Sequence, residues 1–470
     1  MCAAFTPRIA DVRQRFLVVY GHSCVACFVA LAACPFVFSA PEINRTSDHP
    51  GQLIRIRDPL AGENFCYPTV PHRLPDPGES IEDSRLGTVQ TRVTEKPGVR
   101  HEYARMSPFN ANCSMILLLD VRDGTWNVYR TKSRPYDSDA NYVCTLHAEE
   151  PRWDGIGTLW ATRDFKVLQI DAISGNEVVV KDFSDDPRIA PLLKAEPDLY
   201  RITMKDEGEA STDYRFWAFI VQGANDDYRA RYLLVWDRLN DQITGLRPLA
   251  VEESRIDWIG MSPLGTWVLI GSDHDNGGSF PGFVMADKTL MNIYPLHYST
   301  GHADVGLDSI NREVVVMQNA QTDFIDLIPL DPDTRPIPPG GDYAGTGHVP
   351  LVRLFYASDS PAGLQSGVHI SCNVAGWCVV STHMEAGQKE QNWLDRSIIL
   401  VRLQEKSPSA YYVSKVHGSC NTYWQETHAS ISADGSRVVW ASNWGSNEDV
   451  AHVTLMELAL PPGWMKTLMK

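Results

Sequence analysis

The sequence is poor in basic residues: 42 Lys and Arg stand against 58 Asp and Glu, giving a formal net charge of -16 over 470 residues. Nucleic acids and anionic membrane surfaces are bound mainly through clustered Lys and Arg side chains. The charge therefore argues against both as the main partner. It leaves room for an anionic ligand, provided that a few arginines make its site locally basic.

Long apolar runs are also scarce. Beyond residue 34, no stretch approaches the ~20 apolar residues that a helix needs to cross a bilayer. The run Phe16–Cys34 follows Arg13 and Arg15, which is typical of an export signal. Its end, Leu31-Ala32-Ala33-Cys34, resembles the cleavage box of bacterial lipoproteins, in which the cysteine is lipidated.

These features predict an exported protein that is secreted, periplasmic or held as an outer-membrane lipoprotein. We expect residues 1–40 to form a signal peptide, with a lipoprotein signal ending before Cys34 as one form of it. We expect residues 41–470 to form a single domain, and we expect a membrane contact only through such a lipid anchor.

Several common catalytic signatures are missing. No G-x-S-x-G elbow and no phosphate-binding or dinucleotide glycine motif occurs, which excludes the enzyme classes that depend on them. The cysteines that follow the signal segment are sparse and widely spaced, unlike those of a disulfide scaffold. They are Cys66, Cys113, Cys144, Cys372, Cys378 and Cys420.

What the chain does contain is a repeat. Three segments align: HADVGLDSINREVVV from His302, HISCNVAGWCVV from His369 and HASISADGSRVV from His428. Each starts with histidine, has a turn in its middle and continues into a β-branched strand. Segments that start near residues 102, 150, 206 and 257 share the strand–turn–strand pattern without the histidine.

Seven starts at a spacing of roughly 45 to 65 residues predict an all-β fold, a seven-bladed β-propeller of four-stranded antiparallel blades. One blade cannot bury both of its faces alone, so blades stack into a ring. Only about one blade of chain follows the last start. We therefore expect QLIRIRDPLA, near residue 52, to supply the missing strand and close the ring.

The segment SADGSRVVWASNWG, which starts at Ser432, is similar to the repeat of TolB-type, WD40-like propellers. MSPLGTWVLIG and MSPFNANCSMILL are looser copies, and the resemblance extends over about residues 100–460. It implies the propeller fold. It does not imply a function, because propellers serve as enzymes, receptors and scaffolds.

The repeated histidines are the candidate functional residues. The residue just before the innermost strand of a blade lies at the mouth of the central channel, so His302, His369 and His428 should meet there, with Gln425 on the loop of His428. Three imidazoles and a carboxamide suit a divalent metal such as Mn or Zn, and suit Ca less well. The alternative is that each histidine only bonds the backbone of a neighbouring blade.

This constellation resembles that of the oligogalacturonate lyases, which are seven-bladed propellers with a metal held by a His in one blade and a Gln-x-x-His-x-His cluster in the next. The resemblance implies that His369, Gln425 and His428 are metal ligands. It also implies that His302, one blade earlier, is the catalytic histidine.

The chain departs from that pattern at Ser430, where the last histidine of the cluster would stand. Cys372 and Cys420 are the candidate replacements, and a thiolate ligand would favour Zn. The ulvan lyases, exported seven-bladed propellers that act on a uronate polysaccharide, are the neighbouring comparison.

The chemistry implied is β-elimination on a uronate, in which a cation neutralises the carboxylate and a base removes the weakly acidic C5 proton. We expect His302 to be the base. Arginines on other loops could clamp sugar carboxylates and aromatic residues could stack on sugar rings, although surface charge and packing between blades are their ordinary roles. The candidates are Arg105, Arg152, Arg201, Trp153, Trp258, Tyr423 and Trp424.

Two functions are therefore compatible with the sequence. The first is an exported lyase, a monomer or dimer that cleaves a uronate-containing polysaccharide or oligosaccharide of ulvan or pectate type. The second is a non-catalytic, TolB-like binding or scaffold propeller in the periplasm. The histidines favour the first, and the repeat by itself favours the second.

Overall fold

The structure is a computed structural model of the 470-residue chain. It describes residues 53–60, 67–225, 228–273, 276–319, 321–336, 346–354, 366–390, 392–446 and 453–469. The expected signal segment, with Cys34, and also Cys66 lie outside the described residues. No helix within these ranges is long and apolar enough to span a membrane.

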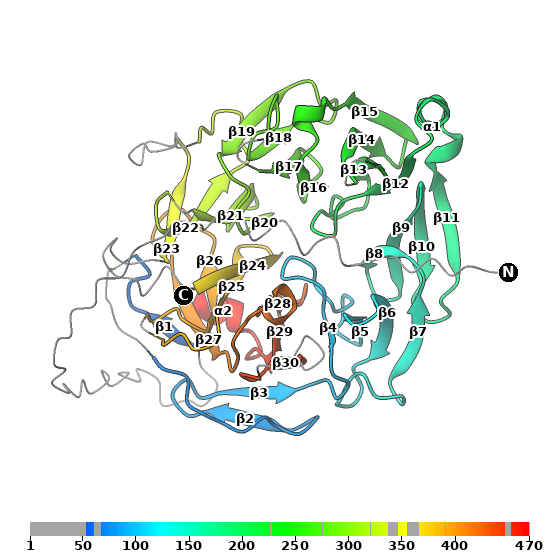
Figure 1. Cartoon of the computed structure of the whole chain (residues 1–470). Coiled ribbons are helices and arrows are strands. Elements are labelled where there is room, and N and C mark those ends of the chain that lie inside the picture. Colours follow the sequence, from blue (N-terminus) through cyan, green and yellow to red (C-terminus); the bar gives the residue numbers. More distant parts are fainter. Residues whose placement is uncertain are drawn as a thin grey trace, which may run out of the picture. The chain divides into compact units, whose positions relative to one another are not determined.

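Seven antiparallel sheets are arranged around a ring (Figure 1). Five blades follow one another along the chain, each with four strands in sequence order. They are β4 (Val99–Arg100), β5 (Met115–Asp120), β6 (Thr125–Arg130) and β7 (Tyr142–Leu146); β8 (Glu149–Asp154), β9 (Thr158–Arg163), β10 (Lys166–Asp171) and β11 (Glu177–Asp182); β12 (Leu199–Thr203), β13 (Phe216–Gly223), β14 (Ala230–Asp237) and β15 (Gln242–Pro248); β16 (Ile256–Met261), β17 (Val268–Ser272), β18 (Phe283–Ala286) and β19 (Ile293–His297); and β20 (Ala303–Leu307), β21 (Glu313–Asn319), β22 (Phe324–Pro329) and β23 (Val349–Arg353).

The last two blades recruit strands from the start of the described chain and have five strands each. The sixth contains β24 (Ser366–Val374), β25 (Trp377–Met384), β26 (Ser397–Arg402) and β27 (Ala410–Lys415), with β1 (Ile54–Ile56) at its outer edge. The seventh contains β28 (Ser430–Ile431), β29 (Arg437–Ser442) and β30 (Thr454–Ala459), followed by β3 (Thr88–Arg92) and β2 (Ser80–Asp83). The expected all-β, seven-bladed propeller is confirmed.

The expected closing strand is wrong. The stretch near residue 52 forms β1, which pairs with β27 in the sixth blade. The ring is closed instead by β3, which pairs with β30: Thr91 faces Glu457, and Arg92 faces Met456. The seventh blade has only three strands from the end of the chain, so the edge of β30 would be left unpaired without β3.

The repeat positions follow the innermost strands. Six of these strands begin within about three residues of the expected starts. In the third blade, β12 begins at Leu199, ahead of the expected start near 206. The pattern at 206 lies in the segment after β12, where the carbonyl of Glu209 accepts a hydrogen bond from the N–H of Met261 in β16.

The hydrophobic core lies between adjacent blades. Successive residues of the middle strands are buried on both faces, as in β17, where all five residues are buried. One cluster joins Val316 of the fifth blade to Ile370 of the sixth, and another joins Val379 of the sixth to Val438 of the seventh. Each such side chain contributes roughly 1.5–3 kcal/mol on burial, so the ring is stabilised blade by blade.

Candidate functional site

The three repeated histidines come together at the inner edges of consecutive blades. His302 precedes β20 of the fifth blade, His369 lies within β24 of the sixth, and His428 comes two residues before β28 of the seventh. The ring centroids of His302 and His369 are 4.9 Å apart, and those of His369 and His428 are 3.9 Å apart. The shared repeat position thus predicts the convergence, although His369 stands inside its strand rather than before it.

Two further residues complete a group that we call the histidine cluster: His302, His369, His383, His428 and Glu426. Glu426 Oε2 lies 2.7 Å from Nε2 of His369 and 3.2 Å from Nε2 of His428. Glu426 Oε1 lies 3.8 Å from Nε2 of His383, whose ring is stacked on His369 at a centroid distance of 5.2 Å. The carboxylate is therefore the centre on which three imidazoles converge.

His383 reaches the cluster from the second strand of its blade. It stands on β25 opposite Gly367 of β24, and a Cβ at Gly367 would lie only 2.0 Å from Nε2 of His383. The missing side chain at Gly367 is what lets the imidazole cross the inner strand.

The orientation of His428 is fixed by a buried arginine. Arg100, which is 0% exposed, donates from Nη2 to Nδ1 of His428 over 2.8 Å. A guanidinium can only donate, so this nitrogen of His428 must be the acceptor. The proton of the neutral imidazole then lies on Nε2, where it points to Glu426. His428 therefore positions the carboxylate, and its Nε2 has no free lone pair for a metal in this ring orientation.

Two tyrosines border the cluster. The ring of Tyr103 lies 5.4 Å from that of His369 and 5.0 Å from that of His428, and it stacks on Tyr423 with an interplanar angle of 13°. Tyr423 remains 37% exposed. Part of Tyr423 is therefore accessible beside the imidazoles, and its role in stacking on a sugar stays a prediction.

Burial keeps the imidazoles neutral. It lowers the pKa of His302, lowers that of His383 to about 3, and holds the pKa values of His369 and His428 well below the usual range. A neutral imidazole has the lone pair that a metal ligand or a general base needs. The imidazoles of His302, His369 and His383 can therefore take either role at pH 7.

Burial also holds His101, next to the cluster, in its neutral form. Burial lowers its pKa to about 3, and its Nε2–H donates to the carbonyl of His428. The unfolded chain binds a proton near pH 6.5 that the folded chain does not, so this contribution to stability is complete above that pH and is lost as the pH falls toward 3. At pH 5 the loss amounts to about 2 kcal/mol.

When the pH is lowered from about 7.5 to 5, we therefore expect the free energy of unfolding to fall by about 2 kcal/mol less in His101→Phe than in the wild type. Urea unfolding at each pH measures the difference. His147→Ala, at an exposed histidine, should keep the wild-type dependence. Equal pH slopes for His101→Phe and the wild type would show that His101 is not held neutral by burial.

A subset of the cluster has the arrangement of a metal site. Ligand atoms of His369, His383 and Glu426 all lie within 4.8 Å of one another. Nδ1 of both histidines is buried and has no hydrogen-bond partner in the described part of the chain. Two imidazoles and one carboxylate, with further positions open, could hold a catalytic divalent metal.

The structure does not place the other expected ligands in this group. Oε1 of Gln425, the last residue of the 3-10 helix η5 (Tyr423–Gln425), accepts a hydrogen bond from the N–H of Asn421, just before that helix. Burial raises the pKa of the Cys372 thiol well above its usual range and that of Cys420 to about 12, which disfavours the thiolate that a metal requires. The carboxylate next to Gln425 occupies the position that the sequence reasoning gave to the carboxamide.

Each arginine predicted to clamp a substrate is already paired with a carboxylate. The pairs are Arg105 Nη2 with Glu207 Oε2 at 3.1 Å, Arg152 Nη1 with Glu102 Oε2 at 2.8 Å, and Arg201 Nη1 with Glu149 Oε2 at 2.8 Å. The side chains of Arg105 and Arg152 are at least 95% buried. A substrate carboxylate would have to compete with an internal partner at all three.

The predicted tryptophans serve mainly as structure. Trp258 is 2% exposed; it packs on Phe283, and the guanidinium of Arg105 covers its ring at 4.3 Å. Trp153 donates from Nε1 to the carbonyl of Pro108 over 2.8 Å. Trp258 therefore has no exposed face on which a sugar could stack.

The fold and this site define the class of protein: a seven-bladed β-propeller with a His/Glu cluster where its fifth, sixth and seventh blades meet. No family model and no curated protein matches the sequence. Among solved structures, the chain is similar to an oligogalacturonate lyase in complex with manganese, at 11% sequence identity and a TM-score of 0.51, over 83% of this chain and 98% of that one. An oligogalacturonate lyase from Vibrio parahaemolyticus has a TM-score of 0.49 at 11% identity, over 82% of this chain and 97% of that one. At such identities, the likeness to the manganese complex shows the fold.

Proposed function

We propose that this protein is an exported polysaccharide lyase that cleaves a uronate-containing glycan of ulvan or pectate type by β-elimination. The observation that carries the proposal is the histidine cluster. In this cluster the neutral imidazole of His302 lies beside residues of the types that bind metals. The likeness of the fold to a manganese-bound oligogalacturonate lyase supports it.

The metal would be held by His369, His383 and Glu426, whose chemistry fits Mn or Zn. When bound, such an ion supplies positive charge that neutralises the carboxylate of the uronate and so acidifies the neighbouring C–H. Nε2–H of His428 donates to the carboxylate of Glu426, and Arg100 fixes the orientation of that imidazole by donating to its Nδ1.

His302 is the proposed base. It lies outside the ligand set, its ring 4.9 Å from that of His369, and burial lowers its pKa so that its lone pair is free at pH 7. A base in this place could take the C5 proton from a sugar whose carboxylate is held beside His369. Tyr423 would support the ring of the same sugar.

The assay of wild-type protein on pectate fragments and on ulvan tests the proposal. Absorbance of the unsaturated product should rise with untreated protein, fall after chelation and return when Mn or Zn is added. Metal analysis of the purified protein should find a bound divalent ion. No product from either substrate, with or without these metals, would contradict the lyase function.

Gly367→Ala tests the ligand set without relying on activity. The new Cβ would displace the imidazole of His383, so the affinity for Mn or Zn should fall at least about tenfold, as measured by calorimetric titration. Gly157→Ala is the matched control, because a Cβ there meets nothing within 4 Å. Unchanged metal affinity in Gly367→Ala would remove His383 from the site.

The second candidate, a non-catalytic binding or scaffold propeller of the periplasm, is favoured by the arginines. All three that were expected to clamp a substrate are paired internally, as in the buried pair of Arg152 with Glu102. A protein that binds a glycan without forming unsaturated product would support this function instead.

A further inference from the structure

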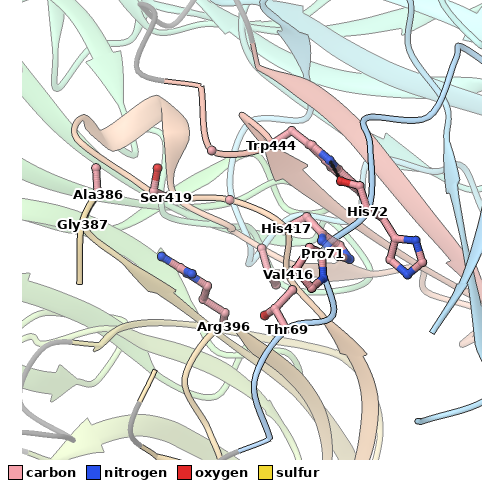
Figure 2. A pocket seen from close by; sticks show the side chains of 12 residues that line it. Thr69, Pro71, His72, Ala386, Gly387, Arg396, Val416, His417, Ser419 and Trp444 are labelled. Carbon is pink, nitrogen blue, oxygen red and sulfur yellow. Dashed lines mark hydrogen bonds between the residues drawn. The ribbon is translucent and has the colours of Figure 1, made fainter. Parts of the chain in front are cut away.

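A hollow lies between the sixth and seventh blades. Its volume is about 480 Å³, within the range typical of small-molecule sites, and none of its lining residues belongs to the histidine cluster (Figure 2). Side chains from segments far apart in sequence surround it. Those that matter here are His72, Arg396, His417, Ser419 and Trp444.

The lining is locally basic in an acidic protein. Its described lining residues include Arg396 and no carboxylate, although the chain carries a net charge of -16. Among the described residues, Arg396 makes no hydrogen bond or ion pair through its side chain, and its Nε is buried without a partner. Figure 2 shows this side chain extending across the hollow toward Ala386 and Ser419. A planar guanidinium with its donors unused is suited to a carboxylate.

The same hollow presents a fixed aromatic ring. Trp444 stacks on His417 with ring centroids 4.3 Å apart and an interplanar angle of 18°, and its Nε1 donates to the carbonyl of His72 over 2.9 Å. A ring fixed on one face and at its polar edge offers apolar area at little cost in conformational entropy. The ligand that fits both features has a ring with an apolar face and carries a carboxylate.

One segment connects this hollow to the histidine cluster. Residues 416–419 line the hollow, directly after β27, and the same connection continues to Glu426 and His428 before β28. The hollow and the histidine cluster are therefore formed in part by the same connecting segment.

We propose that the hollow binds a uronic acid unit of the glycan at a distance from the histidine cluster, with Arg396 on the carboxylate and Trp444 against the sugar ring. The identity of this ligand rests on the proposed function. The site itself is defined by its own residues and does not require cleavage.

Calorimetric titration of chelator-treated protein with D-galacturonate, D-glucuronate and D-galactose tests this site. The two uronates should bind more tightly than galactose, and Arg396→Gln should weaken their binding about ten- to a hundredfold. Trp444→Ala should weaken it as well. Arg130→Gln, at an exposed arginine of the first blade, should bind as the wild type does.

The result separates the site from the lyase function. Uronate binding that depends on Arg396 supports the site even if no unsaturated product forms with any substrate. Equal binding by Arg396→Gln and the wild type, equal binding of galactose and the uronates, or no binding by the wild type would overturn the site, even if the protein is a lyase.

Discussion

Replacing His302 by alanine is expected to lower kcat on pectate or ulvan fragments by about 10²–10⁴-fold, the usual contribution of a positioned general base. The imidazole is neutral and lies beside the proposed metal ligands without being one of them. Its removal should therefore leave the metal content and the fold intact. Initial rates of product absorbance, metal analysis and a thermal melt measure the three effects.

Two controls make this result specific. His147→Ala, at an exposed histidine, should keep full activity. Added imidazole should restore part of the rate of His302→Ala, because a free base can occupy the space that the side chain leaves. If His302→Ala keeps a rate close to that of the wild type, His302 is not the base, while the fold and the metal site are unaffected by that outcome.

Replacing Arg100 by methionine is expected to destabilise the protein by about 3–5 kcal/mol, because it leaves several buried acceptors without a donor. The fully buried guanidinium donates to Nδ1 of His428, to the carbonyl of His101 at 2.8 Å and to the carbonyl of Trp424. The first two of these groups lie in different blades. The free energy of unfolding from urea titration measures the loss.

Arg100→Lys is the matched variant. It keeps the positive charge but has a single donor group, so it should recover only part of the stability. Because the tautomer of His428 depends on Arg100, both variants should also weaken the hold on Glu426 and lower the affinity for Mn or Zn. A loss below about 1 kcal/mol in Arg100→Met would show that water replaces the guanidinium.

The repeat carried most of the information that the sequence holds about the fold. Histidines at the same repeat position occupy equivalent places in their blades. The proximity of His302, His369 and His428 could therefore be predicted from the sequence. The closing strand could not be identified, because β1 and β3 are both short stretches of strand-forming residues. Their partners depend on which outer edge is left open, and that is decided only when all blades are formed.

His383 and Glu426 could not be predicted from the repeat, for a reason that is local in each case. The repeat predicts the location of residues at the innermost strand of each blade. His383 lies on the second strand and reaches inward only across Gly367. That glycine, facing a histidine in the next strand, was the available signal. Glu426 stands directly beside Gln425, and a choice between the two required the turn that engages the carboxamide with Asn421.

The pairing of β3 with β30 also sets an order of events during protein synthesis. The N–H of Val93 donates to the carbonyl of Leu455, so the segment around β3 is synthesised long before its partner. Until then β3 presents an open edge, and contacts this remote in sequence form slowly. A chain that ends before Thr454 would keep that edge exposed, and should therefore be prone to aggregation rather than form a slightly shortened propeller.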